Sequence, residues 1–81
     1  MNVITGERLR ALREDSDLTQ REIAAMLNCS QVSYSHYELG RRDIPLDYLV
    51  ILADFYNVSV DYILGITDSK QRYPKLTSGR R

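Results

Sequence analysis

One stretch of the chain, from Leu18 to Arg42, constrains its fold more than any other. It reads LTQREIAAMLNCSQVSYSHYELGRR and contains two short amphipathic segments, Thr19–Leu27 and Gln31–Glu38. Apolar residues recur in it at the spacing of an α-helix, and about three residues separate the two segments. The pattern predicts two short helices joined by a tight turn, with the rest of the chain supporting them.

Residues at the ends of these two helices favour the same interpretation. Thr19 and Glu22 have the spacing of a capping box, in which each side chain accepts a hydrogen bond from the backbone N–H of the other. Ser30 is a suitable N-cap for the second helix. Asn28 and Gly40 tolerate the left-handed backbone conformation that commonly ends a helix. Local chemistry and apolar periodicity therefore predict the same boundaries.

The pattern elsewhere predicts three more helices. One covers residues 6–15, with Thr5 as its N-cap. Another begins at Pro45, and a short one covers Val60–Leu64. No segment alternates polar and apolar residues for long enough to form a strand. The predicted fold class is all-α, a compact five-helix bundle.

The composition changes after Ile66. The remaining stretch, TDSKQRYPKLTSGRR, is polar, basic and interrupted by Pro74, which favours a flexible tail. We therefore divide the chain into a domain, residues 1–66, and a basic C-terminal tail, residues 67–81. A tail of this composition can also fold on a partner protein.

The composition argues against several classes of protein. The single cysteine, Cys29, cannot form an internal disulfide and has no Cys or His cluster around it to bind zinc. With one histidine and no glycine-rich phosphate loop, the chain is not expected to be an enzyme or to bind a metal or other cofactor. No apolar run is long enough for a membrane span, and the N-terminus lacks a secretory signal. We expect a cytoplasmic protein without membrane contact.

The net charge is 0, but the charges are unevenly distributed. Residues 43–65 carry four acidic side chains and no basic one, whereas residues 66–81 carry five basic side chains and one acidic one. Any nucleic-acid surface must therefore be local rather than a strongly basic face.

The helix predicted over Gln31–Glu38 has one face suited to DNA. At about 100° per residue, four side chains fall within an arc of about 140°, opposite Tyr34 and Tyr37. We call these four residues the recognition face: Gln31, Val32, Ser35 and His36. The face is mostly polar and carries no carboxylate to repel phosphate, and a helix of this diameter fits the major groove.

Each residue of the recognition face has a plausible contact in that groove. Gln31 can form a bidentate pair with N6 and N7 of adenine, and Val32 can touch a thymine methyl group. Ser35 or His36 can bond base edges or phosphate. An ordinary solvated helix face is the alternative.

Four residues are predicted to contact the DNA backbone: Gln20, Ser30, Arg41 and Arg42. Gln20 opens the helix before the turn, where its side chain and backbone N–H can hold a phosphate oxygen. Arg41 and Arg42 follow the recognition face and carry positive charge. Ordinary solvated surface is the alternative for the two arginines.

Several motifs, in this order and spacing, resemble the helix-turn-helix family of lambda-type repressors and Cro proteins, also called the XRE family. The resemblance runs from about Gly6 to Gly65. The motifs are LRALR at 9–13, LTQ at 18–20 with IA at 23–24, SQVSYSHYELG at 30–40 and VSVDYILG at 58–65. The resemblance implies a lambda-repressor-like DNA-binding bundle and a small transcriptional regulator. Repression by covering a promoter is the favoured mode, and activation by contact with polymerase through the acidic stretch 43–65 is the alternative.

The resemblance also implies roles for individual positions. It assigns contacts with DNA to Gln20, Gln31, Val32 and His36. Arg13 and Glu38 match an ion pair that ties the first helix to the end of the third. Val32 stands where a polar base-contacting residue is common. Tyr34 stands where an aliphatic core residue is more usual, so its hydroxyl needs a partner or a path to water.

Partners beyond DNA follow from the size of the domain. One such domain contacts about one half-site, so we predict a two-fold homodimer on half-sites about 34 Å apart. The expected dimer surface is an apolar group near the end of the domain: Tyr56, Val58, Tyr62 and Ile66. A core position is the alternative for Val58 and Tyr56. A second function also stays open, a protein-interaction module such as an antitoxin that binds a partner protein.

Overall fold

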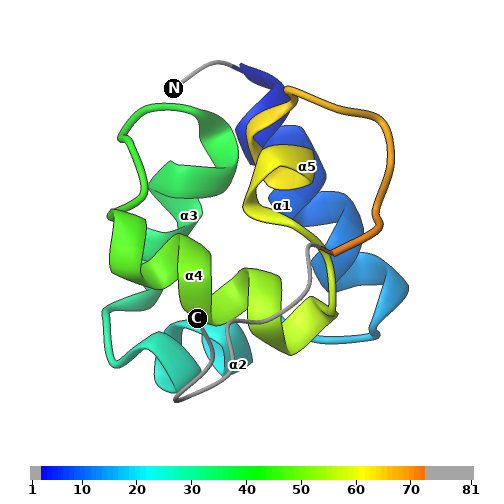
Figure 1. The fold of residues 1–81 in the computed structure, drawn as a ribbon. Helices are drawn as coiled ribbons and strands as arrows, with labels where there is room; N and C mark the ends of the chain where they lie inside the picture. The colour runs from blue at the N-terminus through cyan, green and yellow to red at the C-terminus, as the bar shows by residue number, and fades with distance from the viewer. Residues whose placement is uncertain (1–2, 73–81) are drawn as a thin grey trace, which may run out of the picture.

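The computed structural model describes residues 3–72, and within this range the chain forms five helices and no strand. The helices are α1 (Val3–Asp15), α2 (Gln20–Leu27), α3 (Gln31–Leu39), α4 (Leu46–Tyr56) and α5 (Val60–Leu64). In Figure 1, α5 lies against α1 and α4 crosses the front of the bundle. None of the described helices is long and apolar enough to cross a membrane. The predicted all-α, five-helix fold is confirmed.

The helices α2 and α3 begin and end as their caps predict. The Glu22 N–H donates to the Thr19 hydroxyl at 3.1 Å, and the Thr19 N–H donates to the Glu22 carboxylate at 2.8 Å, so the capping box is present. Ser30 caps α3 by accepting from the Ser33 N–H at 3.0 Å. Asn28 ends α2 in the left-handed conformation, with φ of 60°. The turn between the two helices is therefore set locally, by the left-handed backbone at Asn28, whose N–H bonds carbonyls of α2, and by the Ser30 hydroxyl that caps α3.

The helix α1 differs from its prediction, which began it at residue 6 with Thr5 as N-cap. The helix begins three residues earlier, and Thr5 lies buried inside it. Tertiary contacts explain the additional turn. A Cβ at Gly6 would overlap with the backbone carbonyl of Glu38, so α1 and α3 approach closely there. Ile4, in the same turn, lies against Gly65 at the end of α5.

The core lies between the helices and is almost wholly apolar. Its buried apolar residues come from every helix and from two connecting segments: Leu9, Leu12, Ile23, Ala24, Leu27, Tyr34, Ile44, Leu49, Leu52, Ala53, Val58 and Ile63. Tyr34 is the largest of the fully buried side chains. The inner side of α3 is therefore fixed by an aromatic ring at the centre of the molecule.

Two arginines attach the segment after α5 to the bundle. Arg8 of α1 donates through Nη2 to Asp68 at 2.7 Å, and Arg72 donates to Asp54 of α4 at 3.0 Å. This described part of the predicted tail has no regular secondary structure but lies against the bundle. The rest of the tail, residues 73–81, lies outside the described residues.

Candidate nucleic-acid interface

The recognition face lies on the outside of the bundle. Val32 is 67 % exposed, Gln31 is exposed, and Ser35 and His36 are partly exposed. On the other side of the same helix, Tyr34 has no exposed surface. The division of α3 into an outer, mostly polar face and an inner aromatic side is therefore present in the structure.

A shallow hollow of about 300 Å³ opens on this face. It is lined by residues of α2, α3 and the following loop: Gln20, Gln31, Val32, Ser35, His36, Leu39 and Arg41. Leu39 is the lining residue that the sequence analysis missed. It is 58 % exposed and lies seven residues after Val32, about two helical turns, so the spacing alone could have placed it on this face. The lining residues include no carboxylate, which suits a surface that meets phosphate.

Aromatic packing holds the inner side of α3. The Tyr34 and Tyr37 ring centroids lie 6.2 Å apart, and those of Tyr37 and Tyr48 lie 6.3 Å apart, in edge-to-face arrangements. Such contacts stabilise the fold beyond the burial of apolar area. Because Tyr48 belongs to α4, α3 cannot rotate about its axis without disrupting packing against its neighbour.

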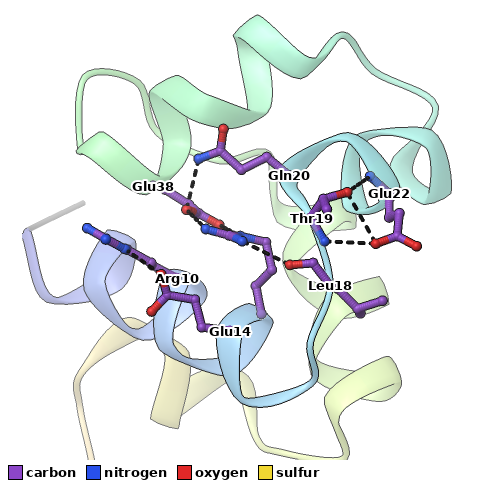
Figure 2. Close-up of polar contacts among 8 residues, drawn as sticks. Arg10, Glu14, Leu18, Thr19, Gln20, Glu22 and Glu38 are labelled. Atoms are coloured by element: carbon purple, nitrogen blue, oxygen red, sulfur yellow. Dashed lines mark hydrogen bonds and ion pairs between the residues drawn. The ribbon is translucent and has the colours of Figure 1, made fainter.

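An ion pair ties the end of α3 to α1. Arg13 Nε donates to Glu38 Oε2 at 2.7 Å and Arg13 Nη2 donates to Oε1 at 3.1 Å, and the two side chains are 13 % and 3 % exposed. Arg13 also donates to the Leu18 carbonyl at 2.9 Å, and Gln20 donates to Glu38 at 3.1 Å. Figure 2 shows Gln20 directed toward Glu38. The Arg13–Glu38 ion pair that the resemblance implied is thus present. Together with the hydrogen bonds to Leu18 and from Gln20, it connects α1, the loop after it, α2 and α3.

The Glu38 carboxylate is held in its charged form despite its burial. Burial by itself raises the pKa of this carboxyl. The hydrogen bonds from Arg13, the contact with the Tyr34 hydroxyl and the hydrogen bond from Gln20 together lower it by more than burial raises it, so the pKa lies below its ordinary value. Removing one partner of such a pair leaves the other buried and uncompensated. The buried ion pair therefore stabilises one orientation of α3 relative to α1.

Two tyrosine hydroxyls are buried near this ion pair. Among the described residues, neither the Tyr34 nor the Tyr56 hydroxyl has a partner at the distance and angle of a hydrogen bond. Burial is the main cause that raises the pKa of both hydroxyls, and the nearby negative charge of Glu38 raises it further. The pKa of Tyr56 is raised to about 12. The Tyr34 hydroxyl thus has no path to water, and its contact with Glu38 is weaker than a well-aligned hydrogen bond. The Tyr34 ring, more than its hydroxyl, anchors α3.

The residues predicted to contact the DNA backbone differ in how many of their polar groups already form hydrogen bonds within the protein. Gln20 is half-buried, and one of its amide N–H groups serves the ion-pair network, which leaves the other for a further acceptor. The Ser30 hydroxyl already caps α3. Arg41 and Arg42 are both exposed. Gln20 and the two arginines therefore retain donors for phosphate.

The four residues predicted for a dimer surface do not form one exposed patch. Val58 is 3 % exposed, so that prediction is corrected: its side chain fills the core, the alternative that the sequence left open. Tyr56 is half-buried. The Arg8 guanidinium lies over Tyr62, 4.2 Å from the ring centroid. Ile66 is 69 % exposed and is the most accessible of the four.

The sequence pattern and the fold agree with one known family. The helix-turn-helix family model matches residues 9–63, which include both helices of the unit and the recognition face between Gln31 and His36. The chain belongs to this family, in its XRE-like form, and the resemblance drawn from the motifs is confirmed.

Curated relatives carry related names. The chain is 50 % identical over 62 residues to the uncharacterized HTH-type transcriptional regulator YobD of Bacillus subtilis (strain 168), covering 76 % of this chain and 55 % of that protein. It is 43 % identical over 60 residues to the HTH-type transcriptional regulator ImmR of the same organism, covering 74 % and 47 %. It is 35 % identical over 60 residues to the antitoxin PezA of Streptococcus pneumoniae serotype 4, covering 74 % and 38 %. The chain spans about half the length of the first two relatives. No solved structure gave a significant match.

Proposed function

We propose that this protein is a cytoplasmic transcriptional regulator, with repression the favoured mode, that binds double-stranded DNA in a sequence-specific manner through α3. The observation that carries the proposal is the recognition face, which is open to the outside while the other side of α3 is held rigidly. Tyr34 packs in the core and the Arg13–Glu38 pair orients the end of the helix. Preorganised elements of this kind lose little freedom when they bind. The names of the curated relatives support the same function.

Within this proposal, base and backbone contacts come from different residues. Gln31 pairs with adenine N6 and N7, while Ser35 and His36 bond base edges, and Val32 meets the same edges with an apolar surface. Phosphate contacts position the protein but carry no sequence information. They come from the flanking residues Gln20, Arg41 and Arg42, whereas the Ser30 hydroxyl is used to cap α3. Repression follows if the bound protein covers a promoter.

A homodimer is the second part of the proposal. One domain contacts about one half-site, and a two-fold pair reads half-sites about 34 Å apart. Ile66, which is exposed, and Tyr62, which is partly exposed, are the two predicted residues that offer surface to a second copy. Sedimentation at micromolar concentration, with and without a selected duplex, measures the association. Monomers under both conditions would contradict the dimer.

The alternative function is a protein-interaction module. One relative is named as an antitoxin, which favours this candidate for a chain of similar sequence. Fluorescence anisotropy on a generic labelled duplex across a salt series separates the two functions. A DNA-binding protein loses affinity steeply as salt displaces its phosphate contacts. No binding at low salt would contradict DNA binding and favour the interaction module.

A further inference from the structure

The outer side of α4 carries several large apolar side chains that are open to solvent. Four of them are between 42 % and 68 % exposed: Leu46, Val50, Ile51 and Phe55. At about 100° per residue, Leu46 and Val50 form one strip along the helix. Ile51 and Phe55 form a second strip, about 140° further around the axis, and we call the two the α4 strips. Apolar side chains gathered on one side of a helix, rather than scattered singly, commonly mark a contact surface.

Two carboxylates lie between the α4 strips. Asp47 and Asp54 are both exposed, and they lie about 80–100° around the axis from Leu46 and about 10 Å apart along it. Arg72 donates to Asp54 at 3.0 Å, whereas no cation among residues 3–72 forms an ion pair with Asp47. This side of α4 therefore fits a segment that carries two cations about 10 Å apart, with apolar side chains beside them.

Hydrogen bonds from α1 direct the chain after α5 toward α4. Arg8 donates to the Thr67 carbonyl and to the Asp68 carboxylate. The Arg8 side chain is 19 % exposed, so these bonds are partly shielded from water. Arg72, the last described residue, then reaches Asp54. The chain that follows therefore starts beside the α4 strips.

The sequence after Arg72 has the composition that this surface requires. It reads YPKLTSGRR and carries Lys75 three residues after Arg72. Pro74 favours a polyproline II or extended backbone at itself and at the residue before it. In polyproline II, residues three apart point the same way and lie about 9 Å apart, close to the spacing of Asp54 and Asp47. The spacing of Arg72 and Lys75 therefore matches that of the two carboxylates.

We infer that residues 73–81 dock on the outer side of α4 of the same chain, with Lys75 paired to Asp47. Tyr73 and Leu76 then cover apolar surface of the α4 strips. The inference is independent of the proposed function, because it uses no residue of the recognition face. The apolar contacts supply most of the stabilisation, since an exposed ion pair contributes little, and the pair sets the register. A second copy fits this surface less well, because its own α4 would bring the same carboxylates against each other.

Nuclear magnetic resonance of the full chain tests the contact. In Lys75→Glu a carboxylate replaces the cation opposite Asp47, so the amide resonances of Asp47 and Val50 should shift from their wild-type positions. Lys70→Glu is the matched control, because it makes the same change in charge on a residue whose Nζ lies 5.8 Å from the Tyr62 ring centroid. Its shifts should centre on Tyr62. Unchanged α4 resonances in Lys75→Glu would overturn the inference.

Exchanging the two charges tests the pairing. Lys75→Asp alone and Asp47→Lys alone should each release the segment, measured as a fall in the 1H–15N heteronuclear NOE of residues 75–78. The double variant should restore the NOE, because the pair forms again with the opposite polarity. Thermal unfolding checks that Asp47→Lys, in the first turn of α4, stays folded, and the Lys75→Glu test does not depend on it. A double variant with an NOE as low as that of either single variant would overturn the pairing.

A spin label identifies the chain whose α4 holds the segment. Ser78→Cys in a Cys29→Ser background carries a nitroxide, and thermal unfolding checks the fold. When 15N chains with the nitroxide are diluted in an excess of unlabelled wild-type chains, the α4 amide resonances should still broaden. Broadening only when 15N chains without the nitroxide are mixed with nitroxide chains would place the segment on a second copy. That result, or no broadening of α4 resonances in either mixture, would overturn the inference.

Discussion

The two sides of α3 differ in burial and in role. On the inner side, Tyr34 has no exposed surface and Glu38 is held by Arg13 at 2.7 Å. On the outer side, Val32 is 67 % exposed, beside the polar residues of the recognition face. The inner side contributes to the stability and orientation of the helix, whereas the outer side is open to a ligand. Substitutions on the two sides should therefore have separable effects, on unfolding and on DNA binding respectively.

The largest effect is expected for Tyr34→Ala. Loss of a fully buried aromatic ring should lower the free energy of unfolding by about 3–5 kcal/mol. Urea unfolding measures the change. Tyr34→Phe keeps the ring and removes a hydroxyl without a full hydrogen bond, so it should be much milder. If Phe were as damaging as Ala, the hydroxyl contact with Glu38 rather than packing would anchor α3.

Arg13→Ala should have the next largest effect. It leaves the buried Glu38 carboxylate without its cation and should lower the free energy of unfolding by about 3 kcal/mol. Arg10→Ala is the matched control, because Arg10 pairs with Glu14 on the surface of the same helix and should change stability by at most about 0.5 kcal/mol. Equal losses in the two variants would show that the buried pair has no special role.

Gln31→Ala tests the outer side. It should weaken binding to the selected duplex by about 1–3 kcal/mol and relax discrimination at one base pair. The midpoint of thermal unfolding should not change, because Gln31 is exposed. Anisotropy titrations on the selected duplex and on single-base variants measure both effects. Equal weakening on every sequence would mean that Gln31 is not a base contact.

A smaller effect is expected from pH, and it belongs to the inner side. The pKa of Glu38 is lower in the folded protein than its ordinary value of 4.5, so its charged form stabilises the fold above that pH. This contribution should disappear as the pH falls below about 4.5 and through the folded-state pKa. The stability difference between the wild type and Glu38→Gln, measured by urea unfolding, should shrink over this range. A difference that is constant with pH would contradict the charged state of Glu38.

The smallest effect is expected for Arg41→Ala. Loss of one phosphate contact should weaken binding to all duplexes alike and reduce the slope of log K against log salt by about 1. Stability should not change, because Arg41 is exposed. A loss confined to the selected sequence would make Arg41 a base contact instead.

The placement of the site residues was partly predictable. The boundaries of α2 and α3 follow from hydrogen bonds that act within four residues, such as the Thr19–Glu22 box, so the sequence alone was enough. Leu39 could have been assigned to the recognition side from helical spacing, but the helix predicted from the sequence ends at Glu38, one residue before it. The hydrogen bond from Gln20 to Glu38 could not be predicted, because it depends on how two helices meet.

The sequence by itself determined which segments become helices and which side of α3 is apolar, because propensities, caps and periodicity are local. Only the tertiary structure decided the additional turn of α1, the place of Val58 in the core and the network around Glu38. These features depend on contacts between residues far apart in the chain, such as Gly6 against the Glu38 carbonyl. Burial against another helix then outweighs weak local preferences, and a short stretch of sequence cannot predict such burial.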